Sequence, residues 1–143
     1  MVKPLSRRLG LLALAACLAA AAFAIVWFVR NGSAAARAKK LKNPIPATAP
    51  ALAAGKQSYV QHCQKCHGEK GNGQGEKAVE LSVAPSDFTN AREMGELADG
   101  QIFQEITEGD LPMPAFADKL TEQERWQIVD YIRTFAPTTA SAH

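Results

Sequence analysis

The stretch Cys63-Gln64-Lys65-Cys66-His67 restricts what this chain of 143 residues can fold into more than any other feature. Two thiols separated by two residues can each form a thioether with one vinyl group of a single porphyrin, and the adjacent His67 can place an imidazole nitrogen on its iron. The motif therefore predicts a covalently attached haem c. Because a haem fills the centre of a small domain, the rest of the sequence has to wrap around it and supply the second axial ligand.

Two other chemistries use paired cysteines. A dithiol redox site is expected near a βαβ pattern, and no strand-like alternation flanks this motif. A structural zinc site needs four Cys or His ligands, usually as two spaced pairs. Here His62 and His67 are the only histidines near the cysteines, and no second pair follows. Haem is favoured over both alternatives.

Charge divides the chain into two parts. The first 50 residues hold eight of the sixteen Lys and Arg and none of the fourteen Asp and Glu, so the remainder has a formal net charge of −6. Phosphate binding needs clustered Lys and Arg, which argues against nucleic acid as a partner of the acidic part. About 90 residues can bury only a small core alone, so we expect haem to supply much of the apolar interior.

Residues 9–29 contain no charged side chain. As a helix this run spans roughly 31 Å, about one hydrocarbon core. The apolar region of a secretory signal is shorter, about 7–15 residues, so we predict an uncleaved transmembrane signal-anchor with residues 1–8 in the cytoplasm. Two alternatives stay open: cleavage at Ala36-Arg37-Ala38, which would release a soluble form, and lipidation of Cys17.

Residues 30–50 are rich in Ala, Lys and Pro, and three prolines, Pro44, Pro46 and Pro50, are expected to interrupt any helix. We predict that this segment is a linker. A flexible chain of this length has an end-to-end distance of roughly 25 Å, which would let the following domain move over the membrane surface.

Three helices are predicted after the linker. Residues 51–61 lead into the cysteine motif, and Gly55 inside them indicates close packing against another helix. Asp99 begins a short helix that Gly109 ends. A capping box, Thr121-Glu122-Gln123-Glu124, begins the last helix, which Pro137 ends. The loops expected between these helices, residues 68–75 and 82–90, are rich in glycine and contain a proline, respectively.

The second axial ligand is expected to be a methionine. Met113 is flanked by Pro112 and Pro114, each fixing its own φ, which suits a loop that presents one sulfur at a set position. Met94 lies among charged residues, and we expect it to face solvent. The two other histidines are weaker candidates, because one lies on the proximal side and one in the tail at 138–143, which we expect to be disordered.

These features together resemble class I monohaem c-type cytochromes of the membrane-anchored bacterial type. The resemblance covers residues 51–136 and rests on the following: Gly55, Tyr59, the Cys63–Gly68 run, Pro85, the Met113–Phe116 segment and Tyr131. It implies a small all-α cytochrome c fold over residues 51–137, wrapped round one covalent haem. It also implies that the first and last helices of this domain cross near Gly55 and Tyr131.

The resemblance further implies the residues of the site. Cys63 and Cys66 would form the thioethers, and His67 and Met113 would bind the iron. In the family a proline carbonyl accepts a hydrogen bond from the proximal imidazole, and Pro85 is the candidate here. Iron with both axial positions filled has no site for a substrate, so we expect a carrier of single electrons rather than an enzyme.

We expect the haem domain on the periplasmic side of the cytoplasmic membrane, held to lipid by the apolar span. A count of Lys and Arg would favour the opposite orientation, but haem is attached to c-type cytochromes outside that membrane. The expected partners are redox proteins, either membrane respiratory complexes or a periplasmic dehydrogenase. The alternatives are a fixed haem subunit of a respiratory or dehydrogenase complex and, less favoured, a haem enzyme such as a peroxidase.

Overall fold

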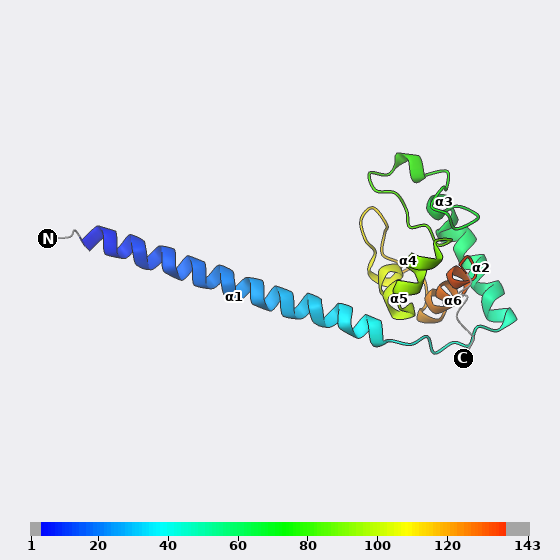
Figure 1. Cartoon of the computed structure of the whole chain (residues 1–143), viewed down its shortest axis with the longest axis horizontal. Helices are drawn as coiled ribbons and strands as arrows, with labels where there is room; N and C mark the ends of the chain where they lie inside the picture. The colour runs from blue at the N-terminus through cyan, green and yellow to red at the C-terminus, as the bar shows by residue number, and fades with distance from the viewer. Residues whose placement is uncertain (1–3, 137–143) are drawn as a thin grey trace. The chain divides into compact units, whose positions relative to one another are not determined.

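The computed structural model describes residues 4–136, and Figure 1 shows them as a chain of helices. Within these residues no strand forms, and the only β-type pairing is an isolated bridge between Asp110 and Met113. The predicted all-α fold is confirmed. The elements are α1 Pro4–Lys40, α2 Ala49–His62, α3 Gln64–His67, the 3-10 turn η1 Ala78–Glu80, α4 Ala91–Glu96, α5 Asp99–Glu108 and α6 Glu122–Arg133.

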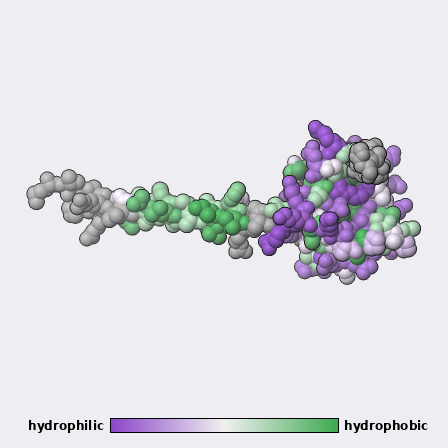
Figure 2. Space-filling view, turned by 60° about the horizontal axis from the view of Figure 1, so that its bottom comes forward, coloured by the Kyte–Doolittle hydropathy of each residue, from purple (hydrophilic) through white to green (hydrophobic). Residues whose placement is uncertain are grey.

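The chain divides into two units, Met1–Arg37 and Ala38–His143. The first unit consists of most of α1, an apolar helix whose large side chains, such as Phe23 and Trp27, are exposed. Figure 2 shows the apolar colouring along this helix. This helix is long and apolar enough to cross a membrane. A signal sequence near an N-terminus has the same properties.

Helix α1 continues to Lys40, beyond the predicted span and into the segment predicted to be a linker. Alanine-rich residues 34–38 favour helix intrinsically, and no proline lies between Pro4, the first residue of α1, and Pro44. Only residues 41–48 between α1 and α2 lack helix. Pro50 does not interrupt a helix but begins one, because it lies in the first turn of α2, behind the N-cap Thr48.

The core of the second unit is the crossing of α2 and α6. A Cβ at Gly55 would overlap the carbonyl oxygen of Gln127 and lie 3.1 Å from Tyr131 Cβ. The two helix backbones are therefore in direct contact, which confirms the predicted crossing near Gly55 and Tyr131. Around it lie the most deeply buried side chains of the described residues, Tyr59, Trp126, Ile128 and Val129.

Aromatic rings surround this crossing. The ring of Tyr59 lies 5.3 Å from those of Tyr131 and Phe135, in edge or tilted arrangements, and its hydroxyl donates to the carbonyl of Gly68 at 2.7 Å. On the other side of α6, Trp126 stacks on Phe103 of α5 with ring centroids 4.0 Å apart. Helix α6 therefore packs against α2 through Tyr131 and against α5 through Trp126.

Helix α6 begins with a recognisable signal. Thr121 Oγ1 accepts from the Glu124 backbone N–H, and the Glu124 carboxylate accepts from the Thr121 N–H, so the predicted capping box is confirmed. The helix itself ends at Arg133. The two predictions for the C-terminus, a helix end at Pro137 and a disordered tail at 138–143, lie outside the described residues.

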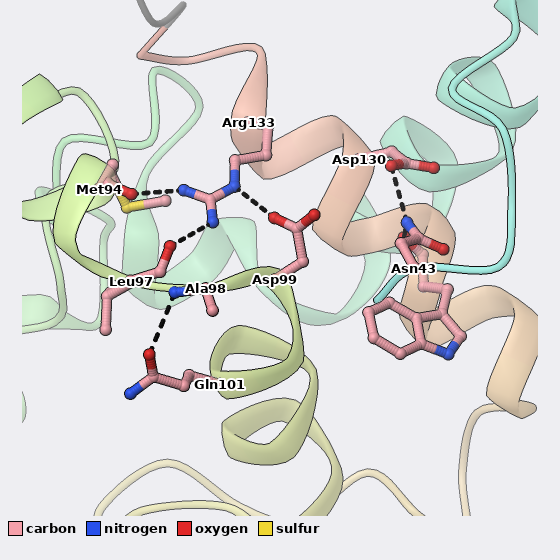
Figure 3. Close-up of polar contacts among 9 residues, drawn as sticks. Asn43, Met94, Leu97, Ala98, Asp99, Gln101, Asp130 and Arg133 are labelled. Atoms are coloured by element: carbon pink, nitrogen blue, oxygen red, sulfur yellow. Dashed lines mark hydrogen bonds and ion pairs between the residues drawn. The ribbon is translucent and has the colours of Figure 1, made fainter. Parts of the chain in front are cut away.

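The prediction that Met94 faces solvent is wrong. Its side chain is 3% exposed and belongs to the core, because α4 turns one face inward and keeps its charged residues outward. Figure 3 shows Arg133 of α6 reaching to the carbonyls of Met94 and Leu97 and to the carboxylate of Asp99. The Arg133 guanidinium thereby holds α4 and the start of α5 against α6.

Candidate haem site

The cysteine motif forms a single helical turn. Backbone N–H groups of Cys66 and His67 both donate to the carbonyl of Cys63, at 3.1 and 2.9 Å, and Gly68, with φ +82°, ends the turn. This compact turn directs the two sulfurs and the imidazole into one cleft. Both thiols are free, so no disulfide competes with thioether formation.

Burial dominates the electrostatics of this turn. The Cys63 side chain is 8% exposed, and its burial, together with the nearby Cys66, raises the pKa of the Cys63 thiol to about 12. The thiol therefore stays protonated at neutral pH. Burial also lowers the pKa of His67, and the contact with the Ser86 carbonyl opposes this shift only in part, so the ring is held neutral.

The His67 ring is fixed by two contacts. Its Nδ1 lies 3.3 Å from the carbonyl oxygen of Ser86, and its plane stacks on Phe88 with centroids 4.6 Å apart and 16° between the planes. With the proton on Nδ1 donated to Ser86, the lone pair of Nε2 is available for iron. A metal-ligating histidine usually makes such a hydrogen bond with its other nitrogen.

The carbonyl beside His67 belongs to Ser86, one residue after the Pro85 to which this role was assigned. Pro85 lines the cleft, and its own carbonyl faces Gly73, where a Cβ would lie 2.5 Å from that oxygen. The glycine-rich loop at residues 68–75 thus packs against the loop at residues 82–90, which carries Pro85 and Ser86. The sequence pattern indicated the correct loop, but the acceptor is the next residue, Ser86. Which of two neighbouring carbonyls points at His67 depends on the backbone conformation of the loop.

Met113 reaches the cleft from the loop between α5 and α6, which Figure 1 shows in yellow, apart from α3. Asp110 and Met113 exchange two backbone hydrogen bonds, of 2.7 and 3.1 Å, which close the loop tightly. Gly109 adopts φ +74°, and a Cβ there would lie 2.8 Å from the Met113 carbonyl oxygen. The loop therefore depends on a glycine as well as on the flanking prolines.

The cleft has a volume of about 780 Å³, including its open mouth, and a mainly apolar lining. Its walls bring together all five of the predicted site residues: Cys63, Cys66, His67, Pro85 and Met113. Two thiols, one neutral imidazole and one thioether facing one apolar space are the donor set that a covalent His/Met haem needs. The residues present fit this group.

Three further titratable residues are among those that line the cleft. His62 lies at its edge, with its ring 6.0 Å from that of Phe116 in an edge arrangement, and Glu105 and Asp110 contribute carboxylates. Partial burial and the neighbouring Asp110 raise the pKa of Glu105. No sequence pattern indicated the two acids, because Glu105 faces the cleft only once Ile102 and Ile106 are buried and orient α5. Met94 does not line this cleft, and His143 lies outside the described residues.

Comparison with known proteins identifies the family of the chain. A family model described as cytochrome C oxidase, cbb3-type, subunit III matches residues 50–132. The chain belongs to this family. It is therefore a monohaem c-type cytochrome, an electron-carrying haem protein that binds one haem c and its iron covalently.

Two solved structures are similar to this cytochrome. A chain of the Kuenenia stuttgartiensis reducing HAO-like protein complex Kustc0457/Kustc0458 is 32% identical with a TM-score of 0.59, over 65% of this chain and 47% of that one. This cytochrome therefore spans about half the length of that relative. The KustC0563 c-type cytochrome is also 32% identical, with a TM-score of 0.52, over 57% of this chain and 96% of its own. No curated protein sequence matches the chain.

Proposed function

We propose that this cytochrome carries single electrons between redox proteins through a haem with His67 and Met113 as axial ligands. The observation that carries the proposal is the single apolar cleft in which both thiols, the imidazole and the thioether meet. The bound haem supplies the ferrous/ferric couple. If His67 and Met113 both bind the iron, no position would be left for a substrate, so the proposal is an electron carrier and not an enzyme.

Each residue has a separate task in this proposal. Cys63 and Cys66 would hold the porphyrin to a helical turn that backbone hydrogen bonds keep in place. The Ser86 carbonyl and the Phe88 ring keep His67 in one orientation. Met113 supplies the softer ligand, which raises the potential relative to a second nitrogen ligand. Ligands held in place in this way would let a bound iron change its charge with little movement of the chain.

We propose that α1 holds this cytochrome to the cytoplasmic membrane, with the haem domain on the periplasmic side. The length and apolar composition of α1 support this, as does the requirement of c-type cytochromes for haem attachment outside the cytoplasm. The acidic haem domain suits a donor or acceptor with basic residues, since opposite charges accelerate encounter. Respiratory membrane complexes and periplasmic dehydrogenases are the proposed partner classes.

A second candidate is a fixed haem subunit of a larger complex. It is favoured by the similarity to a chain that comes from a HAO-like protein complex. Mild detergent extraction followed by gel filtration separates the two candidates. Stoichiometric co-purification of other redox proteins would support the subunit, whereas a free cytochrome would support the mobile carrier.

The proposal is tested by adding carbon monoxide to the reduced holoprotein. A six-coordinate haem with a firmly held Met113 should bind carbon monoxide slowly or not at all. Fast binding in the wild-type protein would show an open or labile position and would favour a haem enzyme such as a peroxidase.

A further inference from the structure

The chain leaves the haem cleft through a short turn at residues 116–120, which we call the 116–120 turn. Its first two backbone N–H groups, those of Phe116 and Ala117, donate to carbonyls in the last turn of α5 at 3.1 and 3.2 Å. The side chain of Phe116 is 6% exposed and lines the cleft together with Met113. One side of this turn is therefore attached to α5.

Arg125, near the start of α6, holds the other side of the turn. Its Nη1 donates to the carbonyls of Ala117 at 3.1 Å and Leu120 at 3.0 Å, and hydrogen bonds from a charged donor are among the stronger kinds. The guanidinium also lies over the ring of Phe103 on α5, 5.3 Å from its centroid, and its Nε is buried. A single cation thus contacts the turn and α5 from α6.

The position of the 116–120 turn bears directly on Met113. Only Pro114 and Ala115 separate Met113 from the turn, and the φ of Pro114 is fixed by its ring. The two hydrogen bonds between Asp110 and Met113 lie within the loop, so they maintain the shape of the loop but not its place in the domain. Contacts outside the loop, such as those of Arg125, have to keep the sulfur in the cleft.

We propose that Arg125 is a positioning residue that keeps Met113 on the iron when the iron is oxidised. This inference rests on the ligation proposed above and names the side chain that maintains it. A methionine ligand raises the reduction potential, so by the thermodynamic cycle the sulfur binds ferrous iron more tightly than ferric iron. In the ferric state the bond therefore depends most on where the protein holds the loop.

The test replaces Arg125 by Gln in the ferric full-length holoprotein in detergent micelles. Imidazole is the probe, because its nitrogen can take the place of a methionine that has left ferric iron, and the loss of the iron–sulfur charge-transfer band follows the exchange. At saturating imidazole the departure of Met113 limits the rate. Since two hydrogen bonds from a charged donor are lost, this rate should rise roughly tenfold or more above that of wild type.

Arg133→Gln is the matched control. Arg133 also donates from α6 to two backbone carbonyls, those of Met94 and Leu97 (Figure 3), and none of these contacts involves the 116–120 turn. This variant should lower the denaturant midpoint about as much as Arg125→Gln does, yet exchange imidazole at the wild-type rate. Equal acceleration in the two variants would show that Arg125 acts only through general stability and would overturn the proposal.

Arg125→Lys covers the case in which the Gln variant does not fold. It keeps the charge but lacks the planar fork of the guanidinium, so its exchange rate should lie between those of wild type and Arg125→Gln. A wild-type exchange rate in the folded Arg125 variants would overturn the proposal.

Amide hydrogen exchange of the peptide covering residues 114–120 gives a readout that does not depend on the iron. This peptide should exchange faster in both Arg125 variants than in wild type and Arg133→Gln, and unchanged protection would overturn the role of Arg125. A wild-type protein without the iron–sulfur band would instead refute ligation by Met113. Failure of this inference and failure of the proposed function are therefore distinguishable.

Discussion

The two walls of the haem cleft are built in different ways. The wall that carries Cys63, Cys66 and His67 is one turn of helix, closed by hydrogen bonds between residues three or four apart. The wall that carries Met113 is a loop whose position depends on Gly109 and on the packing of α5 against α6. The structure of the first wall is determined by hydrogen bonds between residues close in sequence. The structure of the second wall depends on packing between distant parts of the domain.

Removing the local wall should have the largest effect. The double substitution Cys63→Ala and Cys66→Ala leaves no thioether, so we expect a polypeptide without covalent haem and, since the haem fills the core, a poorly folded domain. Mass spectrometry of the intact protein measures this directly. The wild type should exceed its polypeptide mass by one haem, and a wild-type mass equal to that of the amino acids alone would refute the attachment.

Removing the sulfur of the second wall should keep the fold and change the iron. Met113→Ala is expected to give a haem that binds carbon monoxide quickly and has a potential lower by roughly 100 mV or more, within the range of about 0.8 V that axial ligands span. Redox titration and carbon monoxide kinetics measure both. An unchanged visible spectrum would remove Met113 from the iron.

The matched control is Met94→Ala. Because Met94 is buried outside the cleft, its truncation should cost about 2–5 kcal/mol of unfolding free energy while leaving the slow carbon monoxide binding intact. Denaturant unfolding measures the loss. Rapid carbon monoxide binding by this variant would mean that the two methionines have been assigned the wrong way round.

A smaller effect is expected where the second wall depends on backbone geometry. Gly109→Ala places a side chain at φ +74°, 2.6 Å from the backbone nitrogen of Ala115, which strains the loop by about 1–2 kcal/mol. We expect Met113 ligation to become labile, so that carbon monoxide binds faster than in wild type but more slowly than in Met113→Ala. Gly95→Ala serves as the control and should behave as wild type.

The smallest effect concerns charge at the mouth of the cleft. The rate of oxidation by a cationic cobalt complex should fall as ionic strength rises, because the screening length shrinks from roughly 30 Å at 0.01 M to about 8 Å at 0.15 M. Glu105→Gln should weaken this dependence, measured by stopped flow at neutral pH. Rates that do not change with salt would reject electrostatic steering.

The wall that carries Cys63, Cys66 and His67 could be predicted because these three residues lie within five consecutive positions. Their side chains are themselves the groups that attach haem and bind its iron. The helix crossing at Gly55 was also predictable, since a glycine in a helix needs a packing reason. Met113 could be chosen over Met94 from its two prolines, but the burial of Met94 could not be foreseen. That burial depends on contacts between residues far apart in sequence. One of them is the hydrogen bond that Arg133 donates to the Met94 carbonyl, 39 positions away, which holds α4 against α6.

The segment before the domain shows the same limit. Alanine, lysine and proline predicted a linker over residues 30–50, yet α1 runs to Lys40 and the following residues lie against α5 and α6. Composition describes the local preference of the backbone. It contains no information about the single asparagine, Asn43, that donates a hydrogen bond to Asp130. Nor does it show that Gly100 on another helix leaves room for the backbone of Ala38 and Leu41.

The central claim is that one iron is held by a nitrogen from the local wall and a sulfur from the other. X-ray absorption at the iron edge of the purified, oxidised full-length protein measures this directly. We predict one sulfur in the first coordination shell of the wild type, with nitrogen at the remaining positions, and no sulfur in Met113→Ala. A wild-type shell without sulfur, or a sulfur that persists in Met113→Ala, would contradict the account.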